Sequence, residues 1–386
     1  MHAGASERGL VTALLFGNFL IGTGVMLGPG LLAVIAHDFA VSVPQAALVI
    51  TVAATAMCVG SPVLATLTSR VDRRAVLTAS LLLYAVGHGV SALAPNLTSL
   101  VLLRAITLLG AAVFTPQAAA TLGLVLTPER RAGAITTIFL GWSMASVLGS
   151  PLGAWLGAHL GWRLTSALFG GLCLVGVIWV WRVVPAGLHG VALSRDAWLR
   201  VARHPALVLI LAVTAASATG QFTTFAYIAP YVGYVIDNAP TTLSLALALY
   251  GFSGVIGNVW ATRRIAVYGA AANVTVSLWS MTAGMLLLAA AGGGWVAFAI
   301  AAVAWGGGTF ANNSSQQARL ANASPELAGA SIALNTSMIY LGQAFGSIIG
   351  GAMISVAGYR WLPAVGALVL LVALYVSHCA SLRSRH

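Results

Sequence analysis

The sequence predicts an all-α membrane protein whose twelve transmembrane helices form two pseudo-symmetric six-helix bundles. Three observations support this fold class. The chain is 59% hydrophobic and only 6% charged, whereas average soluble domains carry roughly 25% charged residues. Apolar runs of about 20 residues, each long enough to cross the ~30 Å hydrocarbon core of a bilayer, recur along the whole chain. Part of the second half also repeats the first half.

Short loops that hold nearly all of the charge separate the apolar runs. The predicted spans are 10–36, 44–67, 75–94, 98–126, 134–158, 164–184, 206–234, 242–262, 271–291, 295–320, 330–356 and 362–381. The longest polar stretch, residues 185–205, carries three arginines and one acidic residue. We therefore expect an N-terminal bundle over residues 1–184, a linker over 185–205 and a C-terminal bundle over 206–386.

An internal repeat appears when the sequence is shifted by 197 positions. Residues 127–163 then match residues 324–360 at 8 of 37 positions without a gap. The matches include Gly149 with Gly346, Gly153 with Gly350, Gly161 with Gly358 and Arg163 with Arg360. Two parallel six-helix repeats are the architecture of one large class of secondary transporters, with the substrate site between the repeats near mid-bilayer.

The distribution of positive charge predicts the orientation of the chain. All eighteen basic residues are arginines, and fifteen of them fall in one set of alternate loops. These are Arg8, Arg70, Arg73, Arg74, Arg130, Arg131, Arg182, Arg195, Arg200, Arg203, Arg263, Arg264, Arg319, Arg383 and Arg385. Only Arg163 and Arg360 fall in the other set. The positive-inside rule therefore places both termini in the cytoplasm, and the scattered arginines argue against a nucleic-acid partner despite a net charge of +11.

Other function classes lack their sequence signals. Cys58, Cys173 and Cys379 lie in apolar runs at no metal-ligand spacing and are interpreted as packing residues. No His/Asp/Glu metal cluster, nucleophile–base pair or glycine-rich phosphate loop occurs among the spans. The sequence therefore predicts no enzyme activity, no metal and no cofactor. The long first apolar run predicts an uncleaved first span.

Polar side chains inside the spans are the candidate binding residues. Arg104 lies within the fourth span, where a charge is costly and normally faces the bundle interior, although its side chain could also reach back to the membrane interface. Amides and one tyrosine complete the set of substrate-binding candidates: Asn18, Gln117, Gln221, Tyr227, Asn312, Gln316 and Asn335. Such amides either hold a polar substrate or join neighbouring helices.

Proton coupling needs an ionisable group within the bundle. All seven acidic residues fall in loops or at predicted helix ends. His88, in the outward half of the third span, is the one buried titratable candidate besides Arg104, and a simple hydrogen-bonded interior histidine is the alternative. The fifth span holds Gly149, Pro151 and Gly153, which predict either close helix packing or a hinge between the bundles.

Five stretches in order resemble the major facilitator superfamily, and within it the twelve-span drug:proton antiporter and arabinose/chloramphenicol efflux branch. They are residues 21–42, 61–77 (SPVLATLTSRVDRRAVL), 100–117 (LVLLRAITLLGAAVFTPQ), 141–157 (GWSMASVLGSPLGAWLG) and 322–351. The resemblance covers the whole chain. It departs from the branch at Val25, where many members carry a glutamate, and at Ser69, where an aspartate is usual.

The resemblance implies a monomeric secondary transporter of the bacterial inner membrane. It would export a sugar-like compound or a small amphiphilic antibiotic by alternating access, coupled to protons, with spans 1, 4, 7 and 10 lining the cavity. The loop with Arg70, Asp72 and Arg73 would latch the cytoplasmic side, and Gly149, Pro151 and Gly153 would assist gating. The missing first-span acid leaves an uncoupled facilitator open, as well as an importer of a small polar solute. A transport-inactive receptor or scaffold is a further alternative.

Overall fold

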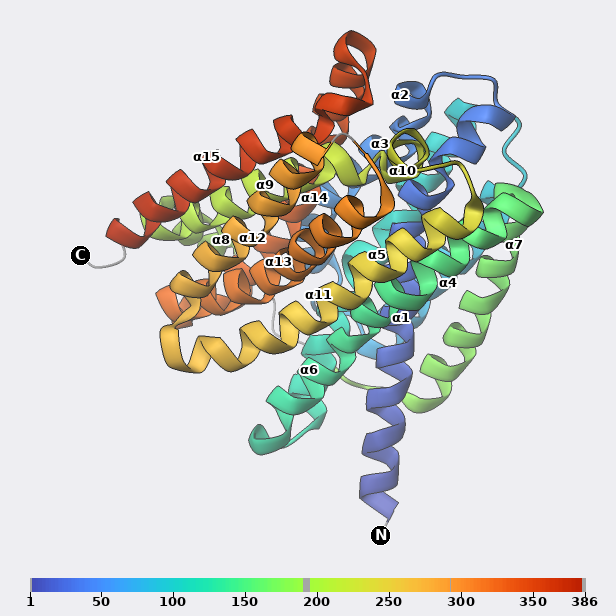
Figure 1. Cartoon of the computed structure of the whole chain (residues 1–386). Coiled ribbons are helices and arrows are strands. Elements are labelled where there is room, and N and C mark those ends of the chain that lie inside the picture. Colours follow the sequence, from blue (N-terminus) through green and yellow to red (C-terminus); the bar gives the residue numbers. More distant parts are fainter. Residues whose placement is uncertain (1, 190–194, 292, 384–386) are drawn as a thin grey trace.

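The computed structural model describes residues 2–189, 195–291 and 293–383, and every regular element in those ranges is helical (Figure 1). The N-terminal bundle comprises α1 (His2–Asp38), α2 (Val43–Ala46), α3 (Leu48–Leu67), α4 (Arg73–Ser91), α5 (Leu97–Val125), α6 (Pro128–Met144), a π-helical turn (Ala145–Gly149) and α7 (Ser150–Val183). A short helix, α8 (Arg195–Arg203), precedes the C-terminal bundle. That bundle comprises α9 (Pro205–Phe225), α10 (Ile228–Val235), α11 (Pro240–Tyr268), α12 (Ala270–Ala291), α13 (Trp295–Ala323), a 3₁₀ turn (Pro325–Leu327), α14 (Ala328–Ala357), a second 3₁₀ turn (Tyr359–Trp361) and α15 (Leu362–Arg383).

The described helices are consistent with twelve membrane crossings. Ten segments are long and apolar enough to span a membrane. One of them, Gly133–Val183, contains two crossings, because the chain turns at Gly161 with φ 77°. The 19-residue α4 supplies the remaining crossing, since 19 residues of α-helix extend about 28 Å. The all-α fold class predicted from the sequence is thus confirmed.

The seventh predicted span differs from the structure. The sequence predicts one helix over 206–234, with Tyr227 on it, but the chain breaks between α9 and α10. The backbone of Tyr227 leaves the helical region at φ −111° and ψ 21°, and the N–H groups of Ala226 and Tyr227 turn back to the carbonyls of Phe222 and Thr224. Tyr227 therefore occupies the break rather than a helical turn.

The internal repeat is visible in backbone conformation and in packing. Gly161 and Gly358 both have positive φ, 77° and 81°, where the chain turns between two crossings. A side chain is strained in this region and glycine is not. Gly149 and Gly153 lie against Thr23 and Leu27 of α1, and the matching Gly346 and Gly350 lie against α9. Equivalent helices thus pair in the same way in both bundles.

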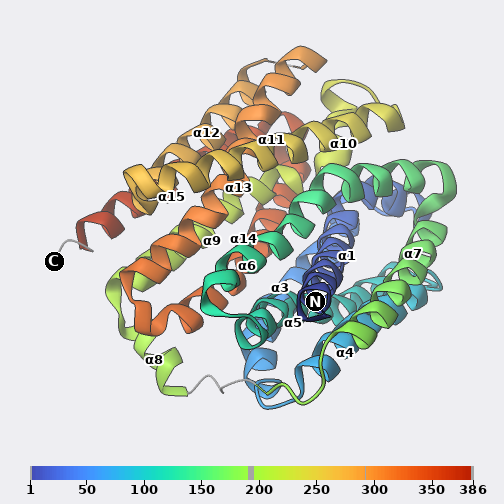
Figure 2. The ribbon, with the colours of Figure 1, turned by 90° about the horizontal axis from the view of Figure 1, so that it is seen from below.

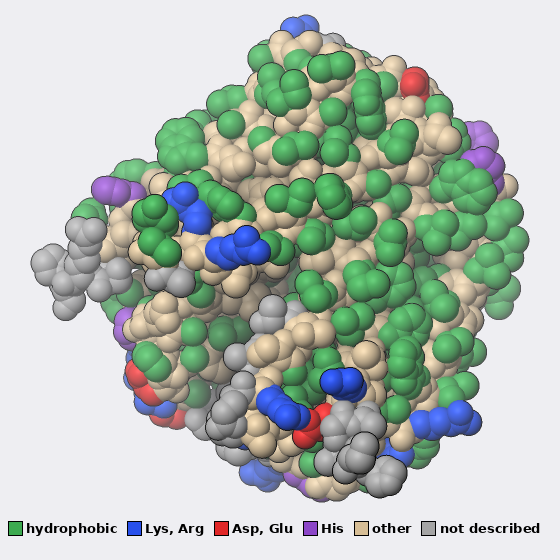
Figure 3. Space-filling model, turned by 60° about the horizontal axis from the view of Figure 1, so that its bottom comes forward, with side chains coloured by type: hydrophobic (Ala, Val, Ile, Leu, Met, Phe, Trp, Pro, Cys, Tyr) green, Lys and Arg blue, Asp and Glu red, His purple; other side chains and the backbone are tan. Residues whose placement is uncertain are grey.

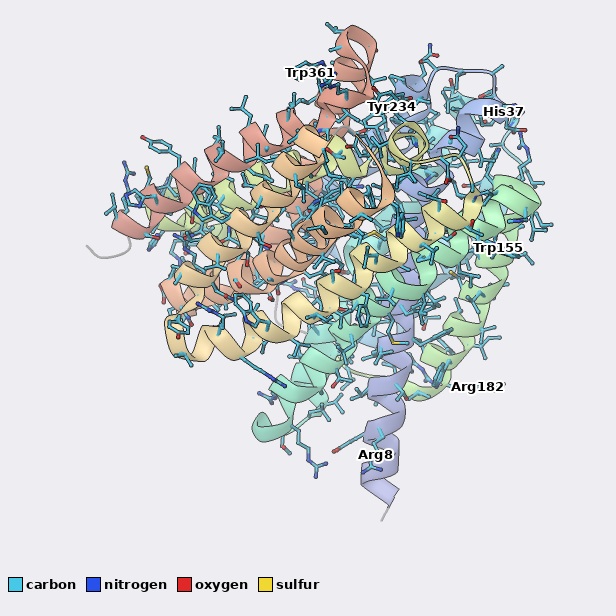
Figure 4. All side chains as sticks on the ribbon, viewed as in Figure 1. Arg8, His37, Trp155, Arg182, Tyr234 and Trp361 are labelled. Carbon is cyan, nitrogen blue, oxygen red and sulfur yellow. The ribbon has the colours of Figure 1, made fainter. Side chains whose placement is uncertain are left out.

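The two bundles meet on one side of the molecule. We call the side that carries the chain ends and the connection between the bundles the terminal side; the N-terminus lies at the bottom of Figure 1 and points toward the viewer in Figure 2, and the C-terminus lies at the left edge of both views. Arg8 and Arg182 lie toward this side, whereas His37, Tyr234 and Trp361 lie on the opposite side (Figure 4). Among the described residues, two hydrogen bonds join the bundles. Thr51 Oγ1 donates to Ser347 Oγ at 2.8 Å, and Ser244 Oγ donates to the carbonyl of Pro151 at 3.1 Å. All four residues lie in the outer halves of their helices, away from the terminal side.

Arginines are numerous on the terminal side (Figure 3), but Arg319 corrects the sequence interpretation. It was expected to be a loop residue that sets topology. Instead α13 continues to Ala323, and Arg319 is 5% exposed inside the C-terminal bundle. Its guanidinium donates to Ser377 Oγ, to the Ser377 carbonyl and to Ser381 Oγ. Arg319 thus packs α13 against two serines that lie one helical turn apart on α15, and it does not act as a loop residue that sets topology.

Candidate substrate and coupling site

Arg104 points into the N-terminal bundle. Its side chain is 6% exposed, and Nη2 donates to the Gly24 carbonyl of α1 at 3.2 Å. The alternative in which it reaches back to the membrane interface is not the conformation observed. Its Nε has no hydrogen-bond partner among the described residues. None of the described acidic residues is buried, so the guanidinium has no buried carboxylate to neutralise it. An interior charge with spare donors suits an electronegative ligand group.

His88 lies beside the same stretch of α1. A Cβ on Gly24 would lie 2.8 Å from His88 Nε2 and 2.5 Å from the Tyr84 hydroxyl. The imidazole packs edge-on against the Tyr84 and Phe169 rings, each with centroids 4.8 Å away. Tyr84 is held by a hydrogen bond to the Ile21 carbonyl, whereas His88 Nε2 has no partner among the described residues. Gly24 therefore leaves room for both ring systems, and the structure brings His88 and Arg104 to one place on α1.

Asn18 and Gln117 join helices within the N-terminal bundle. Thr115 Oγ1 donates to Asn18 Oδ1 at 2.7 Å and accepts from the indole of Trp142 at 3.2 Å. This links α1, α5 and α6. Gln117 Nε2 donates to Thr68 Oγ1 at the end of α3. Asn18 Nδ2 and Gln117 Oε1 are left without a partner among the described residues. In each amide, one polar atom thus forms a hydrogen bond between helices, and the other polar atom remains available to a ligand.

Three amides of the C-terminal bundle converge on α9. Thr214 Oγ1 donates to Asn335 Oδ1 of α14 at 2.6 Å and accepts from Gln316 Nε2 of α13 at 3.1 Å. One turn away, Asn312 Nδ2 donates to Ser217 Oγ at 3.1 Å. Asn312 and Gln316 therefore share a face, as their i, i+4 spacing predicts. Asn312 Oδ1, Gln316 Oε1 and Asn335 Nδ2 have no partner within the described structure.

Gln221 and Tyr227 lie apart from these amides. Gln221 Nε2 donates to the Tyr250 hydroxyl at 2.9 Å, and the Tyr250 ring packs on Phe225 and Trp305. The Tyr227 hydroxyl donates to the Ser347 carbonyl at 2.6 Å, next to the contact between Ser347 and Thr51 that joins the bundles. The structure therefore associates Tyr227 with the contact between the bundles rather than with the Thr214 amides.

The loop between α3 and α4 is bound to its own bundle. The Asp72 carboxylate accepts from Ala75 N at 3.2 Å and from Gly187 N. Partial burial raises the pKa of Asp72, but the N–H donors of Gly187, Ala75 and Arg74 outweigh this effect and hold the pKa below its usual value. Arg73 is buried, and its N–H donates to the Leu188 carbonyl. Arg70 is exposed. Within the described residues, no hydrogen bond or ion pair joins this loop to the C-terminal bundle.

The fifth-span residues divide between two roles. Gly149 and Gly153 face α1 of their own bundle so closely that a Cβ would lie 2.1 Å from Thr23 Oγ1 or 2.2 Å from Leu27 Cδ2. Pro151 instead offers its carbonyl to Ser244 of the other bundle. The π-helical turn at 145–149 precedes Pro151. Gly251 of α11 packs closely against this turn, because a Cβ on Gly251 would lie 2.5 Å from the backbone of Ser146. The glycines thus serve close packing, and the contact between bundles lies on the other helix face.

Several residues at these sites were not selected from the sequence. They are mostly hydroxyl or aromatic residues: Thr51, Tyr84, Thr115, Trp142, Thr214, Tyr250, Trp305 and Ser347. A threonine or serine within an apolar run is common and bonds its own helix carbonyls, so composition does not mark it. The repeat does mark Ser347, which matches Ser150 at the 197-residue offset.

Comparisons with known proteins agree with this architecture. Residues 14–342 match the family model described as Major Facilitator Superfamily. The chain belongs to the major facilitator superfamily. It is 31% identical over 363 residues to the inner membrane transport protein YdhP of Escherichia coli (strain K12), covering 94% of this chain and 93% of that protein.

Solved structures show the same fold at low identity. A crystal structure of a D-xylose–proton symporter has a TM-score of 0.77 at 16% identity, covering 96% of this chain and 97% of that one. A bacterial homolog of the human lysosomal transporter Spinster, in an inward-facing and unoccupied conformation, has a TM-score of 0.75 at 16% identity, covering 98% and 97%. These structures show the fold, whereas the family match and the similarity to YdhP support a multi-pass inner-membrane transporter of small solutes rather than an enzyme.

Proposed function

We propose that this major facilitator transporter exports a neutral, hydroxyl-bearing small solute, sugar-like or a small amphiphilic antibiotic, by alternating access coupled to protons. The substrate would lie between the bundles, with Asn18, Arg104 and Gln117 on one side. The residues on the other side would be Gln221, Asn312, Gln316 and Asn335, with Tyr227 closing the outer end. The protein would work as a monomer, with both termini in the cytoplasm.

The observation that carries the substrate class is a set of incompletely bonded amides. Two donors, Asn18 Nδ2 and Asn335 Nδ2, and three acceptors, Gln117 Oε1, Asn312 Oδ1 and Gln316 Oε1, are buried without partners among the described residues. A buried amide atom left unpaired costs about 1–3 kcal/mol. A hydroxyl both donates and accepts a hydrogen bond, so it can satisfy either kind of atom. The lack of a buried acid among the described residues makes a cationic substrate unfavourable.

Proton coupling would rest on His88 and Arg104. Both approach Gly24, and both keep a nitrogen without a partner in the described structure. Protonation of His88 would place a second positive charge beside the Arg104 guanidinium. Because interactions between charges are strong in an interior of low dielectric, the proton and an electronegative substrate group at Arg104 would be energetically linked.

Alternating access would begin from the conformation described here. The bundles are bonded through Thr51–Ser347 and Ser244–Pro151 on the side away from the termini. The loop with Arg70, Asp72 and Arg73 is bound to its own bundle and not to the other, within the described residues. We therefore interpret this state as closed on the outer side. Transport would require these two bonds to break and the loop to latch the terminal side.

Reconstitution into liposomes tests the proposal. Labelled arabinose and chloramphenicol are supplied in turn with an imposed pH gradient, and flux is followed with and without a protonophore. We expect gradient-driven accumulation of one compound, abolished by the protonophore. Absence of flux for both would reject the substrate class.

Two variants locate the site. Asn312→Leu should reduce flux at least about tenfold, since a lost hydrogen bond plus an unpaired partner costs more than 1 kcal/mol. Asn273→Leu is the matched control, because Asn273 is also buried and its Oδ1 also has no partner among the described residues, but its Nδ2 bonds Ala261 and Ser315 on α11 and α13, away from the α9 face. Equal losses of flux in both variants would mean that the loss comes from disturbed helix packing and not from a lost contact with the substrate.

An uncoupled facilitator is the second candidate. Val25 stands where many members of the resembled branch carry a glutamate, and its side chain is buried without a charge. Such a protein would equilibrate the solute at the same rate with or without the pH gradient. His88→Asn would then leave transport unchanged, whereas the coupled mechanism predicts loss of gradient-driven accumulation.

A further inference from the structure

The outward face of α11 changes character near the terminal side. Exposed apolar side chains recur along this helix at intervals of three to four residues, ending in aromatic and arginine residues. They are Phe252, Ile256, Val259, Trp260, Val267 and Tyr268. The other face of the helix contacts the N-terminal bundle through Ser244 and Gly251. The stripe therefore faces away from the protein and toward lipid.

Arg264 is held at the end of this stripe between two aromatic rings. Its Cζ lies 4.6 Å from the Trp260 ring centroid and 4.3 Å from that of Tyr268, one turn before and after it on the same helix. Trp260 is 42% exposed and Tyr268 is 61% exposed, so neither ring is buried in the protein core. The rings bury Arg264 Nε, which has no partner within the described residues. The neighbouring Arg263 is exposed.

The length of α11 places this group at the membrane interface. Its 29 residues extend about 43 Å, against a hydrocarbon core of ~30 Å. About four residues should therefore lie beyond the core at each end, which puts Arg263 and Arg264 at the boundary and Tyr268 outside it. Interfacial tryptophan and tyrosine are typical of this depth.

Within the described part of the chain, no acidic side chain forms an ion pair with these two arginines. The ion pairs among the described residues join Arg130 to Glu7, Arg163 to Asp38 and Arg200 to Asp196. Arg74 offers an instructive contrast, because it also stacks on a tryptophan but donates to the Trp181 carbonyl at 2.6 Å. The Arg264 guanidinium therefore has donors available for a ligand, and the exposed apolar stripe on α11 next to it can contact the acyl chains of a lipid.

We propose that Arg263, Arg264, Trp260 and Tyr268 form a binding site for one anionic phospholipid in the leaflet on the terminal side. The phosphate accepts from the two guanidinium groups, and the rings hold Arg264 in place by cation–π contact. The acyl chains lie along Ile256 and Phe252. This site does not depend on which solute is transported.

Native mass spectrometry of the full-length protein in detergent, titrated with phosphatidylglycerol, tests the proposal. The Arg263→Gln/Arg264→Gln double variant should bind the first phosphatidylglycerol about 25-fold more weakly, at about fivefold per arginine. Trp260→Leu should weaken binding about threefold. Phosphatidylcholine should bind wild type and the double variant alike.

The control is Arg130→Gln/Arg131→Gln, which removes the same charge from the terminal side. We expect its affinity for phosphatidylglycerol to stay within about twofold of wild type. Equal weakening in both double variants would mean diffuse surface electrostatics and overturn the site. Binding of inorganic phosphate at lipid-like affinity would overturn the lipid assignment in favour of free phosphate. Gel filtration of each variant verifies folding, and Arg264→Lys, which keeps the charge but not the planar stacking, should give an intermediate affinity.

Discussion

Arg104 of the N-terminal bundle and Arg319 of the C-terminal bundle are both buried on membrane-crossing helices, and the two are bonded very differently. Arg319 donates three hydrogen bonds to α15, from 2.9 to 3.1 Å. Arg104 donates one, at 3.2 Å, and its Nε has no partner among the described residues. Both side chains are about equally buried. Arg319 therefore joins helices, whereas Arg104 retains donors that a ligand or a conformational change can use.

Removal of Arg104 should have the largest effect on transport. Arg104→Gln should lower flux in proteoliposomes about 100-fold, because a charged hydrogen bond to a ligand is worth about 1.5–3 kcal/mol and a second donor is lost with it. The melting temperature in detergent should change little, since only the bond to Gly24 is lost from the fold. A large fall in melting temperature would instead give Arg104 the same role as Arg319.

Removal of Arg319 should have the opposite pattern. Arg319→Ala leaves Ser377 and Ser381 without their donor and should cost about 1–3 kcal/mol of stability. We expect a lower melting temperature and, per folded molecule, flux within about twofold of wild type. Flux that collapses while the melting temperature holds would contradict the comparison.

Glycines related by the repeat have different close contacts in the two bundles. Gly153 and Gly350 are equivalent in the repeat, yet a Cβ at Gly153 comes closest to the terminal Cδ2 of the flexible Leu27, whereas a Cβ at Gly350 meets the Thr223 carbonyl oxygen at 2.5 Å. A side chain can move aside more easily than a helix backbone. Gly350→Ala should therefore cost about 1–3 kcal/mol of stability and Gly153→Ala less. Parallel thermal melts of the two variants decide this, and an equal or reversed order would contradict the packing argument.

The smallest effect is expected at Asp72, whose counterpart stretch in the second bundle (258–269), at the end of α11, has no acidic residue. The pKa of Asp72 is below its usual value in the folded protein, so the ionised carboxylate stabilises the fold above its unfolded pKa of about 4. This contribution is lost as the pH falls through the folded value. Asp72→Asn should remove at most about 0.5 kcal/mol at neutral pH, because the carboxylate is partly exposed and asparagine caps a helix about as well, and it should flatten the acid limb of the melting curve. Asp196→Asn is the control, because its exposed ion pair should contribute little.

The sequence predicted the fold well because its signals are local. Spans follow from the length of apolar runs, and the structure agrees with them within a few residues at most ends, for example at α3 and α12. It failed at Tyr227, although Pro230 is a local signal for the break: it has no N–H to bond the Ala226 carbonyl, and its ring clashes with that carbonyl in a continuous helix. It also failed at Arg319, because a serine pair on a distant helix, Ser377 and Ser381, decides whether that arginine is buried.

The candidate site was predicted as residue types rather than as contacts. The amides and Arg104 were selectable because polar groups are rare and costly in a span. Their partners, such as Thr115 and Thr214, were not selectable, since threonine is tolerated throughout apolar helices. The proposed division of roles among these side chains therefore depends on which atoms remain without partners, and only the packed structure shows that.

Composition, the spacing of apolar runs and the 197-residue repeat are enough to establish a helical membrane protein built from two related bundles. Burying the backbone in lipid leaves few other folds, so this outcome depends little on individual side chains. Which buried polar atoms are paired and which face of α7 meets the other bundle are decided by contacts between residues far apart in the chain. Such contacts depend on shape and hydrogen-bond geometry in three dimensions, which no local pattern in the sequence encodes.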